Sequence, residues 1–227
     1  MDTKENATAL GLTFTNLDLL GEALTHRSYI NEHKDSGNHN ERLEFLGDAV
    51  LELSATRFLF DRFPTKPEGE LTAYRAALVN TYSIAEVADA LGVNDMLRLS
   101  KGEKRDTGRA RQIILANAFE AVVGAIYLDQ GYEAADAFLQ THLYPKLDSI
   151  IEQKAYQDAK SRFQEASQDK KGITPSYKTI REEGPDHDRE FTVGVYLKDD
   201  EIARGIGKSK QEAEQAAATN ALDKTGW

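Results

Sequence analysis

The chain has 227 residues, of which 40% are hydrophobic and 29% charged, so it is long enough for two domains that each bury a core. It contains no cysteine, which excludes disulfides, thiolate metal sites and cysteine nucleophiles, and leaves oxygen or imidazole ligands for any metal. The net charge of −10 excludes a uniformly basic nucleic-acid-binding protein, so any such surface must be a local patch.

The pattern from Leu10 to about Gln153 is helical throughout. The clearest periodic runs cover residues 17–25, 42–58, 83–91 and 113–128. The first ten residues are too polar for a signal peptide. The apolar run 113–128 is shorter than the ~20 residues that span a bilayer. We therefore expect this run to be a core helix, with no membrane association and a cytoplasmic location.

The period of the pattern changes after the polar stretch 152–158. A short helix is predicted over 160–168, strands over 177–182, 191–197 and 201–206 with a turn at Asp199-Asp200, and a last helix over 209–222. The sequence thus predicts an all-α domain over residues 1–153, followed by a small α+β domain of order α-β-β-β-α over residues 158–227. The second domain has twelve basic and fourteen acidic side chains, so its net charge of −2 leaves −8 for residues 1–157.

Acidic residues share one side of the predicted helix at 42–58. At ~100° per residue the stripe is formed by Glu41, Glu44, Asp48 and Glu52. The apolar side chains at positions 43, 46, 50 and 53 lie opposite and are expected to be buried. No Lys or Arg is interleaved along the stripe at i,i+4 to relieve the repulsion. A solvated face and a bound cation both remain open as explanations.

Asn117 and Glu120 interrupt the apolar run 113–128 and point the same way. A buried carboxylate costs several kcal/mol unless it is ion-paired, protonated or bound to a metal. Pairing with Arg42 or Arg75 and protonation therefore stay open beside a metal site. Hard oxygen ligands suit Mg²⁺ or Mn²⁺, which support phosphodiester cleavage by activating water and stabilising the leaving oxygen.

Phe45 falls beside the acids and away from the expected core, which indicates a partner surface and hence a dimer. Gly47 either permits close approach of a neighbouring helix or is simply tolerated in its own. A metal-free cleavage by two histidines through the 2′-hydroxyl is the rival chemistry. The placing of the five histidines gives it little support.

The second domain offers three separated polar segments, as recognition of double-stranded RNA by shape requires. Lys208, Ser209 and Lys210 lie at a helix start, where the dipole favours phosphate. The loop 184–189 carries His187. The remaining candidates lie on or near one face of the domain's first helix: Ser161, Gln164, Glu165 and Gln168. Each segment by itself is equally explained as an ordinary cap or solvated surface.

These segments resemble the bacterial ribonuclease III family. The resemblance is carried by NERLEFLGDAVL at 40–51, ALTHRSY at 23–29, EGEL at 68–71 and ILANAFEA at 114–121. Gly184-Pro185 with His187, and the run 207–217, are similar to the family's double-stranded-RNA-binding domain. The match extends over nearly the whole chain, and the twelve-residue segment is highly specific.

The resemblance implies a homodimeric, Mg²⁺-dependent endonuclease of double-stranded RNA, with Mn²⁺ as a substitute and no organic cofactor. The implied products carry 5′-phosphate and 3′-hydroxyl ends with short 3′ overhangs, and ribosomal-RNA precursors and other structured RNAs are the implied substrates. The implied metal ligands are Glu44, Asp48, Asn117 and Glu120. Glu41 and Glu68 would line the cleavage site with Asp48 and Glu120, which would be most critical. Phe45 would dock into the other subunit. Implied RNA contacts are Gln164, Glu165, His187, Lys208 and Lys210.

Two positions depart from the family pattern. The family usually has aspartate where this chain has Asn117, so we expect weaker metal affinity but no outright loss. It often has a second basic residue at Gln211, so phosphate binding should be modestly weaker. Loss of cleavage at Asn117 would leave an RNA-binding regulator, which is the alternative function.

Overall fold

The computed structural model describes residues 2–35, 37–105, 107–185 and 189–227. The chain divides into two compact units, residues 1–156 and 157–227. In the short stretch between the two expected domains, Tyr156 packs edge-on against Tyr74 of the first unit. The candidate RNA contact His187 lies outside the described residues.

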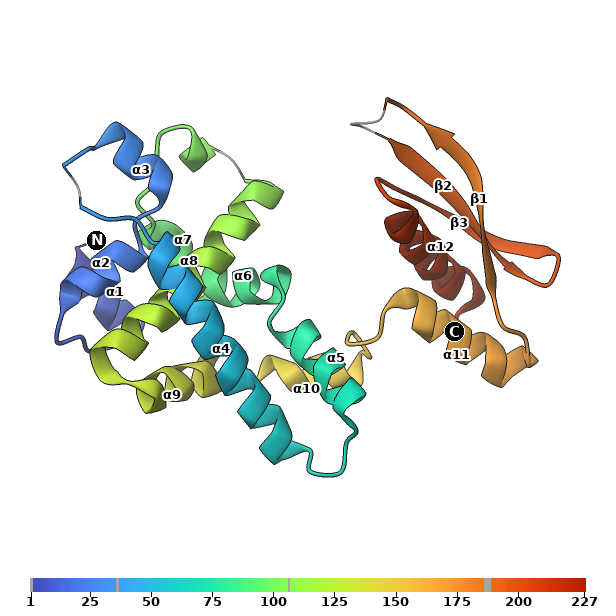
Figure 1. Ribbon diagram of the computed structural model, residues 1–227, viewed down its shortest axis with the longest axis horizontal. Coiled ribbons are helices and arrows are strands. Elements are labelled where there is room, and N and C mark those ends of the chain that lie inside the picture. The colour runs from blue at the N-terminus through green and yellow to red at the C-terminus, as the bar shows by residue number, and fades with distance from the viewer. Residues whose placement is uncertain (1, 36, 106, 186–188) are drawn as a thin grey trace. The chain divides into compact units, whose positions relative to one another are not determined.

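The first unit is helical, and within its described residues the strand-like pairing is limited to an isolated bridge between Thr25 and Arg98. Figure 1 shows its helices packed around α8. The elements are α1 (Thr3–Ala9), α2 (Leu17–Ala23), α3 (Arg27–Glu32), α4 (Glu41–Arg62), α5 (Glu68–Leu78), α6 (Thr81–Ala90), α7 (Val93–Met96), the 3₁₀ turn η1 (Glu103–Arg105), α8 (Arg109–Gln130), α9 (Tyr132–His142) and α10 (Lys146–Glu152).

Helix α8 is the core of this unit. Its middle turns are fully buried, as at Phe119 and Val123. Its ends are not, because Ile113 and Leu128 are exposed, so the expectation of burial along the whole apolar run was wrong at both ends. The helix is long and apolar enough to cross a membrane, with a mean hydropathy of 1.3 over its most apolar window, but 61% of that window is buried inside the unit. That burial is typical of a core helix.

Helices α4 and α8 cross in close contact, because glycine occupies the crossing point on both. A Cβ atom at Gly47 would overlap the carbonyl oxygen of Glu120 and lie 2.8 Å from the Gly124 nitrogen. A Cβ at Gly124 would overlap the Leu43 carbonyl and lie 3.1 Å from the Gly47 nitrogen. The backbones therefore touch at this point, and side chains one turn away on either helix become neighbours.

One side of α4 remains uncovered within the chain. Leu53 was expected in the core but is 60% exposed, on the same side as Phe45 (82%) and Phe60 (69%). Leu53 lies only about 80° from Phe45 around the helix, at the margin of the buried side that Leu43 and Val50 occupy. An apolar stripe thus runs along most of this 22-residue helix.

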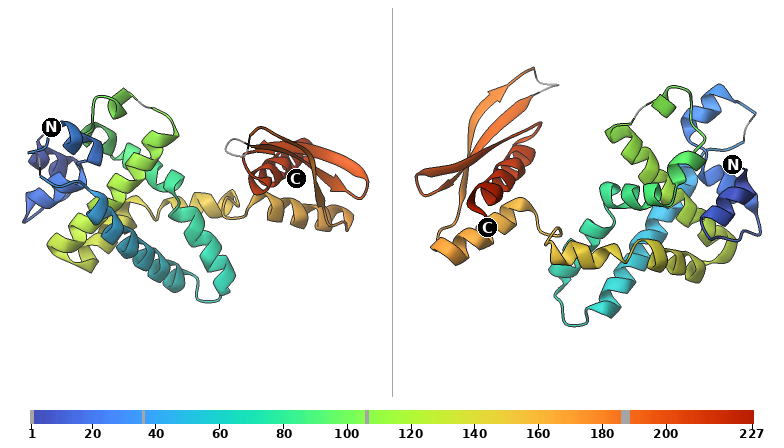
Figure 2. Two further views of the ribbon diagram at one scale, coloured as in Figure 1. Left: turned by 45° about the horizontal axis from the view of Figure 1, so that its top comes forward. Right: turned by 180° about the vertical axis from the view of Figure 1, so that it is seen from behind.

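The second unit has the predicted α-β-β-β-α order. Helices α11 and α12 pack together on one face of an antiparallel sheet of order β1-β2-β3 (Figure 2). Its elements are α11 (Ala159–Lys171), β1 (Ser176–Glu183), β2 (Glu190–Leu197), β3 (Asp200–Gly207) and α12 (Lys210–Thr225). The β2–β3 turn lies one residue earlier than predicted: Leu197 pairs with Asp200, so Lys198 and Asp199 form the turn, and Lys198 adopts a φ of 58°.

Candidate active site

The glycine crossing brings the predicted acidic residues of α4 and α8 together. Burial and, to a smaller extent, the negative charges of Asp48 and Glu44 together raise the pKa of Glu120 to about 7. Glu120 has no ion-pair partner in the described part of the chain. Its charge is therefore opposed by its surroundings, as expected of a carboxylate that requires a proton or a cation.

Glu44 has a raised pKa for the same reasons: burial contributes most and the charge of Glu41 next. A hydrogen bond from the Asn117 side chain acts in the opposite direction, while the charge of Asp48 adds to the rise. Asn117 and Glu44 thus face one another across the two helices. Pairwise interactions near the crossing thus link the four predicted metal ligands, Glu44, Asp48, Asn117 and Glu120.

Glu41 lies at the start of α4 and has two basic neighbours, Arg27 and His39, that the sequence did not predict. Arg27 Nη1 is 3.5 Å from Glu41 Oε1, and His39 Nδ1 is 3.8 Å from Glu41 Oε2. Both come from outside α4, so a search for cations at i,i+4 within the helix could not find them. Arg27 and Glu41 lie in the segments 23–29 and 40–51, which both carry the family resemblance. This shared resemblance is the sequence signal that could have linked the two segments.

The candidate ion pairs for Glu120 are not formed. Arg75 Nε lies 3.1 Å from Glu52 Oε2, and its Nη1 donates to Thr56 Oγ1 at 2.8 Å. Arg75 therefore relieves the far end of the acidic stripe, at Glu52, and leaves Glu120 without its charge. Of the explanations open at the sequence level, a proton or a metal at Glu120 remains.

Glu68 is not brought to the acidic cluster within one chain. It begins α5, accepts a hydrogen bond from Thr72 Oγ1 at 2.9 Å, and lines a hollow of about 410 Å³ between α4 and α5. Thr56 and Phe60 of α4 line the same hollow. Thr56 is fifteen residues beyond Glu41, which corresponds to roughly 22 Å along the helix.

The acidic side chains are near one another without forming a closed metal cage. Among the described residues, no group of three or more His, Asp or Glu side chains is already arranged to hold an ion. The backbone positions are fixed by the glycine crossing, whereas the side chains can still change rotamer. The donor set is all oxygen, which fits Mg²⁺ or Mn²⁺.

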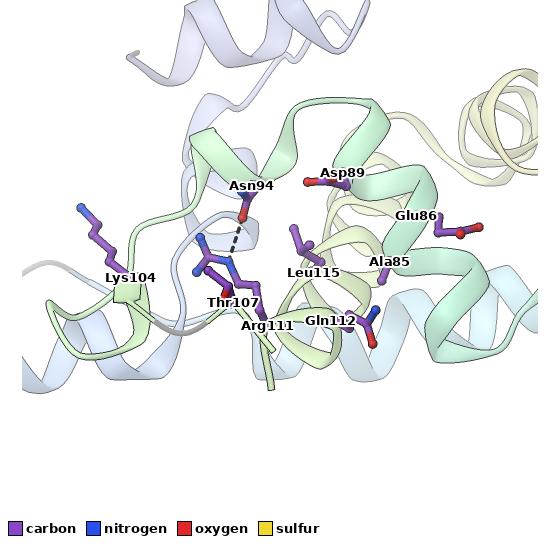
Figure 3. A pocket seen from close by; sticks show the side chains of 9 residues that line it. All are labelled: Ala85, Glu86, Asp89, Asn94, Lys104, Thr107, Arg111, Gln112 and Leu115. Carbon is purple, nitrogen blue, oxygen red and sulfur yellow. Dashed lines mark hydrogen bonds between the residues drawn. The ribbon is translucent and has the colours of Figure 1, made fainter. Parts of the chain in front are cut away.

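A separate hollow of about 370 Å³ lies on another flank of α8 (Figure 3). Arg111 Nε donates to Asn94 Oδ1 at 2.7 Å there, and Glu86 and Asp89 of α6 also line the hollow. Arg111 lies about 120° around α8 from Asn117. None of the predicted site residues lines this hollow.

The predicted RNA contacts of the second unit that can be described are all exposed. Ser209 caps α12 by accepting from the Glu212 backbone, and the Lys210 ammonium lies 5.9 Å from the centre of the Phe191 ring. The Ser161 hydroxyl donates to Asp158 at the start of α11. The exposed set is Ser161, Gln164, Glu165, Gln168, Lys208, Ser209 and Lys210.

Residues 16–147 match the family described as Ribonuclease-III-like, and residues 159–225 match the double-stranded RNA binding motif. The chain belongs to the ribonuclease III family. It is a double-stranded-RNA-specific endoribonuclease, which confirms the family, fold class and enzymatic activity predicted from the sequence. Members of this family are typically metal-dependent.

The similarity extends over nearly the full length of curated relatives. Ribonuclease 3 of Bdellovibrio bacteriovorus is 45% identical over 215 residues, which cover 94% of this chain and 92% of that protein. Ribonuclease 3 of Oceanobacillus iheyensis is 46% identical over 98% of both chains. The ribonuclease III nuclease domain of Campylobacter jejuni, described as having a region involved in dimer formation, is 38% identical with a TM-score of 0.56, over 62% of this chain and 94% of that one.

Proposed function

We propose that this endoribonuclease hydrolyses duplex RNA with Mg²⁺ held at the crossing of α4 and α8. The observation that carries the proposal is Glu120, half-buried beside Asp48 and Glu44 without a cation in the described structure. A bound ion would neutralise these charges, activate a water and stabilise the leaving oxygen. Products would then carry 5′-phosphate and 3′-hydroxyl ends.

The residues divide into ligands and cleavage-site groups. Glu44, Asp48 and Glu120 would bind the ion through carboxylates, with Asp48 and Glu120 contributing most. Asn117 would contribute its amide oxygen, a neutral ligand that leaves the ion less completely neutralised than aspartate would. Glu41, at the end of the same stripe, would line the cleavage site and face the phosphodiester.

The exposed stripe on α4 supports a homodimer. Phe45, Leu53 and Phe60 form a large apolar surface on one helix face, and surfaces of this kind mark interfaces. A two-fold interface is self-complementary. If two copies of α4 pack antiparallel about Leu53, Phe45 of one copy meets Phe60 of the other.

The same packing gives Glu68 a role in cleavage. It would place the hollow lined by Phe60, Thr56 and Glu68 of one protomer beside Phe45 of its partner, close to the partner's acidic cluster. Phe45 would fill the hollow, and Glu68 would line the cleavage site of the other subunit. Each subunit would then cut one strand of the duplex and leave a short 3′ overhang.

The second domain would hold the duplex by its shape. Lys208, Ser209 and Lys210 at the start of α12 suit phosphates, whereas the polar side chains of α11, Ser161, Gln164, Glu165 and Gln168, suit 2′-hydroxyls in the minor groove. His187 would add a third contact. The substrates would be ribosomal-RNA precursors and other structured RNAs of the cytoplasm.

The test is cleavage of a long, end-labelled RNA duplex across a Mg²⁺ titration. We expect cutting to 5′-phosphate ends that EDTA and Glu120→Ala abolish. Glu133→Ala, on the exposed first turn of α9, is the matched control and should cut normally. Duplex binding without cutting at any Mg²⁺ or Mn²⁺ concentration would contradict the proposal and point to Asn117 as the cause.

A further inference from the structure

Glu41 is contacted from two sides by an arginine and a histidine that belong to other segments. Arg27 is the first residue of α3 and His39 precedes the start of α4. They approach different oxygens of the carboxylate, at 3.5 Å from Arg27 and 3.8 Å from His39. Two contacts on two oxygens limit rotation of the carboxylate, which one contact would permit.

Arg27 and His39 belong to segments that backbone hydrogen bonds join into one platform. The Asn40 backbone N–H donates to the Thr25 carbonyl at 2.9 Å, and the His26 N–H donates to the Arg98 carbonyl at 3.0 Å. Asn40 and Thr25 are both buried. His26 caps α3 by accepting from the Ser28 N–H. Arg27 and His39 therefore occupy fixed places relative to the start of α4.

The platform also leaves His39 with an unmet hydrogen-bonding capacity. Its Nδ1 atom is buried and has no hydrogen bond among the described residues, although it faces Glu41. Such an atom is costly to leave unpaired. A small movement of the Glu41 carboxylate toward the ring would satisfy it, so the ring favours one orientation of the carboxylate.

Without Arg27 and His39, Glu41 would be repelled from the site. Its charge already raises the pKa of Glu44, so the two carboxylates are close enough to interact. Like charges on neighbouring side chains favour rotamers that separate them. The charge of Arg27 offsets that repulsion, and the contact with His39 on the other oxygen keeps Glu41 beside the cluster.

We infer that Arg27 and His39 are positioning residues for RNA cleavage, which act by holding the Glu41 carboxylate at the edge of the acidic cluster. The inference rests on the proposed role of Glu41 in cleavage. Exposed ion pairs contribute only about 0–1 kcal/mol to folding, so their removal should alter cleavage far more than stability. Neither residue need touch RNA in this account.

The test is a double-mutant cycle on the rate of cleavage. The single variants are Arg27→Gln, His39→Gln and Glu41→Gln. The double variants combine Glu41→Gln with Arg27→Gln or with His39→Gln. All are compared in the full-length protein at saturating Mg²⁺ and RNA. We expect each single variant to lower kcat by roughly 10-fold or more, as misplacement of a reacting group does. KM for the duplex and the melting temperature should change little. In the Glu41→Gln background, Arg27→Gln and His39→Gln should lower kcat no further.

Two variants provide controls. Arg27→Lys keeps the charge and should restore most of the activity. Arg204→Gln breaks an exposed pair with Glu201 on β3, outside the proposed cleavage site and dimer interface, and should leave kcat unchanged. Additive losses in the double variants would overturn the inference while leaving the role of Glu41 intact. A Glu41→Gln enzyme with normal kcat would overturn both, while the Glu120→Ala result tests the metal site independently.

Discussion

Glu120 couples folding to pH in the metal-free protein. Its pKa is about 7 in the folded state, above the ordinary value of 4.5, because of burial and of Asp48 and Glu44. Between these two pH values the folded protein holds a proton that the unfolded chain has released. Stability is therefore greatest at the lower end of this window and decreases as pH rises through it, by on the order of 3 kcal/mol.

This dependence can be measured by urea unfolding in EDTA, followed by far-ultraviolet circular dichroism. We expect the wild-type helical domain to be less stable at pH 7.5 than at pH 5. Glu120→Gln removes the titrating group and should flatten much of this difference, although Glu44, whose pKa is also raised, leaves part of it. Saturating Mg²⁺ should remove most of the wild-type loss. An equal pH dependence in both proteins would contradict the assignment.

Asn117 would set the charge of the proposed metal site. Asn117→Asp adds a carboxylate beside Glu44 and removes the hydrogen bond that the Asn117 amide donates. We expect Mg²⁺ to bind on the order of tenfold more tightly, since affinity rises with the number of charged ligands. The metal-free variant should be less stable. Calorimetric Mg²⁺ titration and the Mg²⁺ dependence of cleavage measure this, and an unchanged dependence would show that Asn117 does not limit metal binding.

At the scale of elements, the contact between α4 and α8 determines whether a site exists. Gly47→Ala introduces a methyl group where the Glu120 carbonyl already lies, so the helices must separate. We expect a loss of about 3 kcal/mol or more, at or beyond the upper end of ordinary overpacking, with loss of cleavage. Gly69→Ala in α5 is the control, because nothing lies within 4 Å of its Cβ position. Thermal unfolding that is the same for both variants would contradict this account.

The helices and strands were predicted well from the sequence. Which side of each helix is buried, and which residues it contacts, was predicted less well. The acidic stripe and the α-β-β-β-α order followed from the local periodicity of polar and apolar residues, which can be seen within each segment of the sequence. Exposure of Leu53 did not follow, because a residue at the margin of the buried side depends on which neighbouring helix covers it. The Arg27 and His39 contacts with Glu41 were missed for a similar reason: they join segments that are adjacent only after folding.

The role of Gly47 also depends on a contact between segments that are distant in the sequence. The sequence left two explanations open, close approach of a helix or simple tolerance, and the overlap with the Glu120 carbonyl establishes close approach. The identity of the approaching helix could not be derived from α4 alone. It required the partner glycine, Gly124, whose position in an apolar run carries no signal by itself.

At the scale of the whole molecule, one chain does not gather all the predicted cleavage residues. Glu68 lies beside the far half of α4, whereas Glu41 begins that helix. A self-complementary stripe that includes Phe45 and Phe60 would join the two halves across a two-fold axis. Dimerisation would then be a requirement of catalysis.

Phe45→Asp tests this requirement by placing a charge at the most exposed aromatic of the stripe. We expect a dimer for the wild type and a folded monomer for Phe45→Asp by sedimentation velocity at the same concentration, because a buried, unpaired carboxylate opposes association by several kcal/mol. Cleavage should fall sharply, while duplex binding by the second domain persists. Tyr82→Asp, at an exposed aromatic on α6, should remain dimeric and active. If Phe45→Asp sediments as a dimer, the stripe is not the interface, and Glu68 would have to reach the acidic cluster of its own chain.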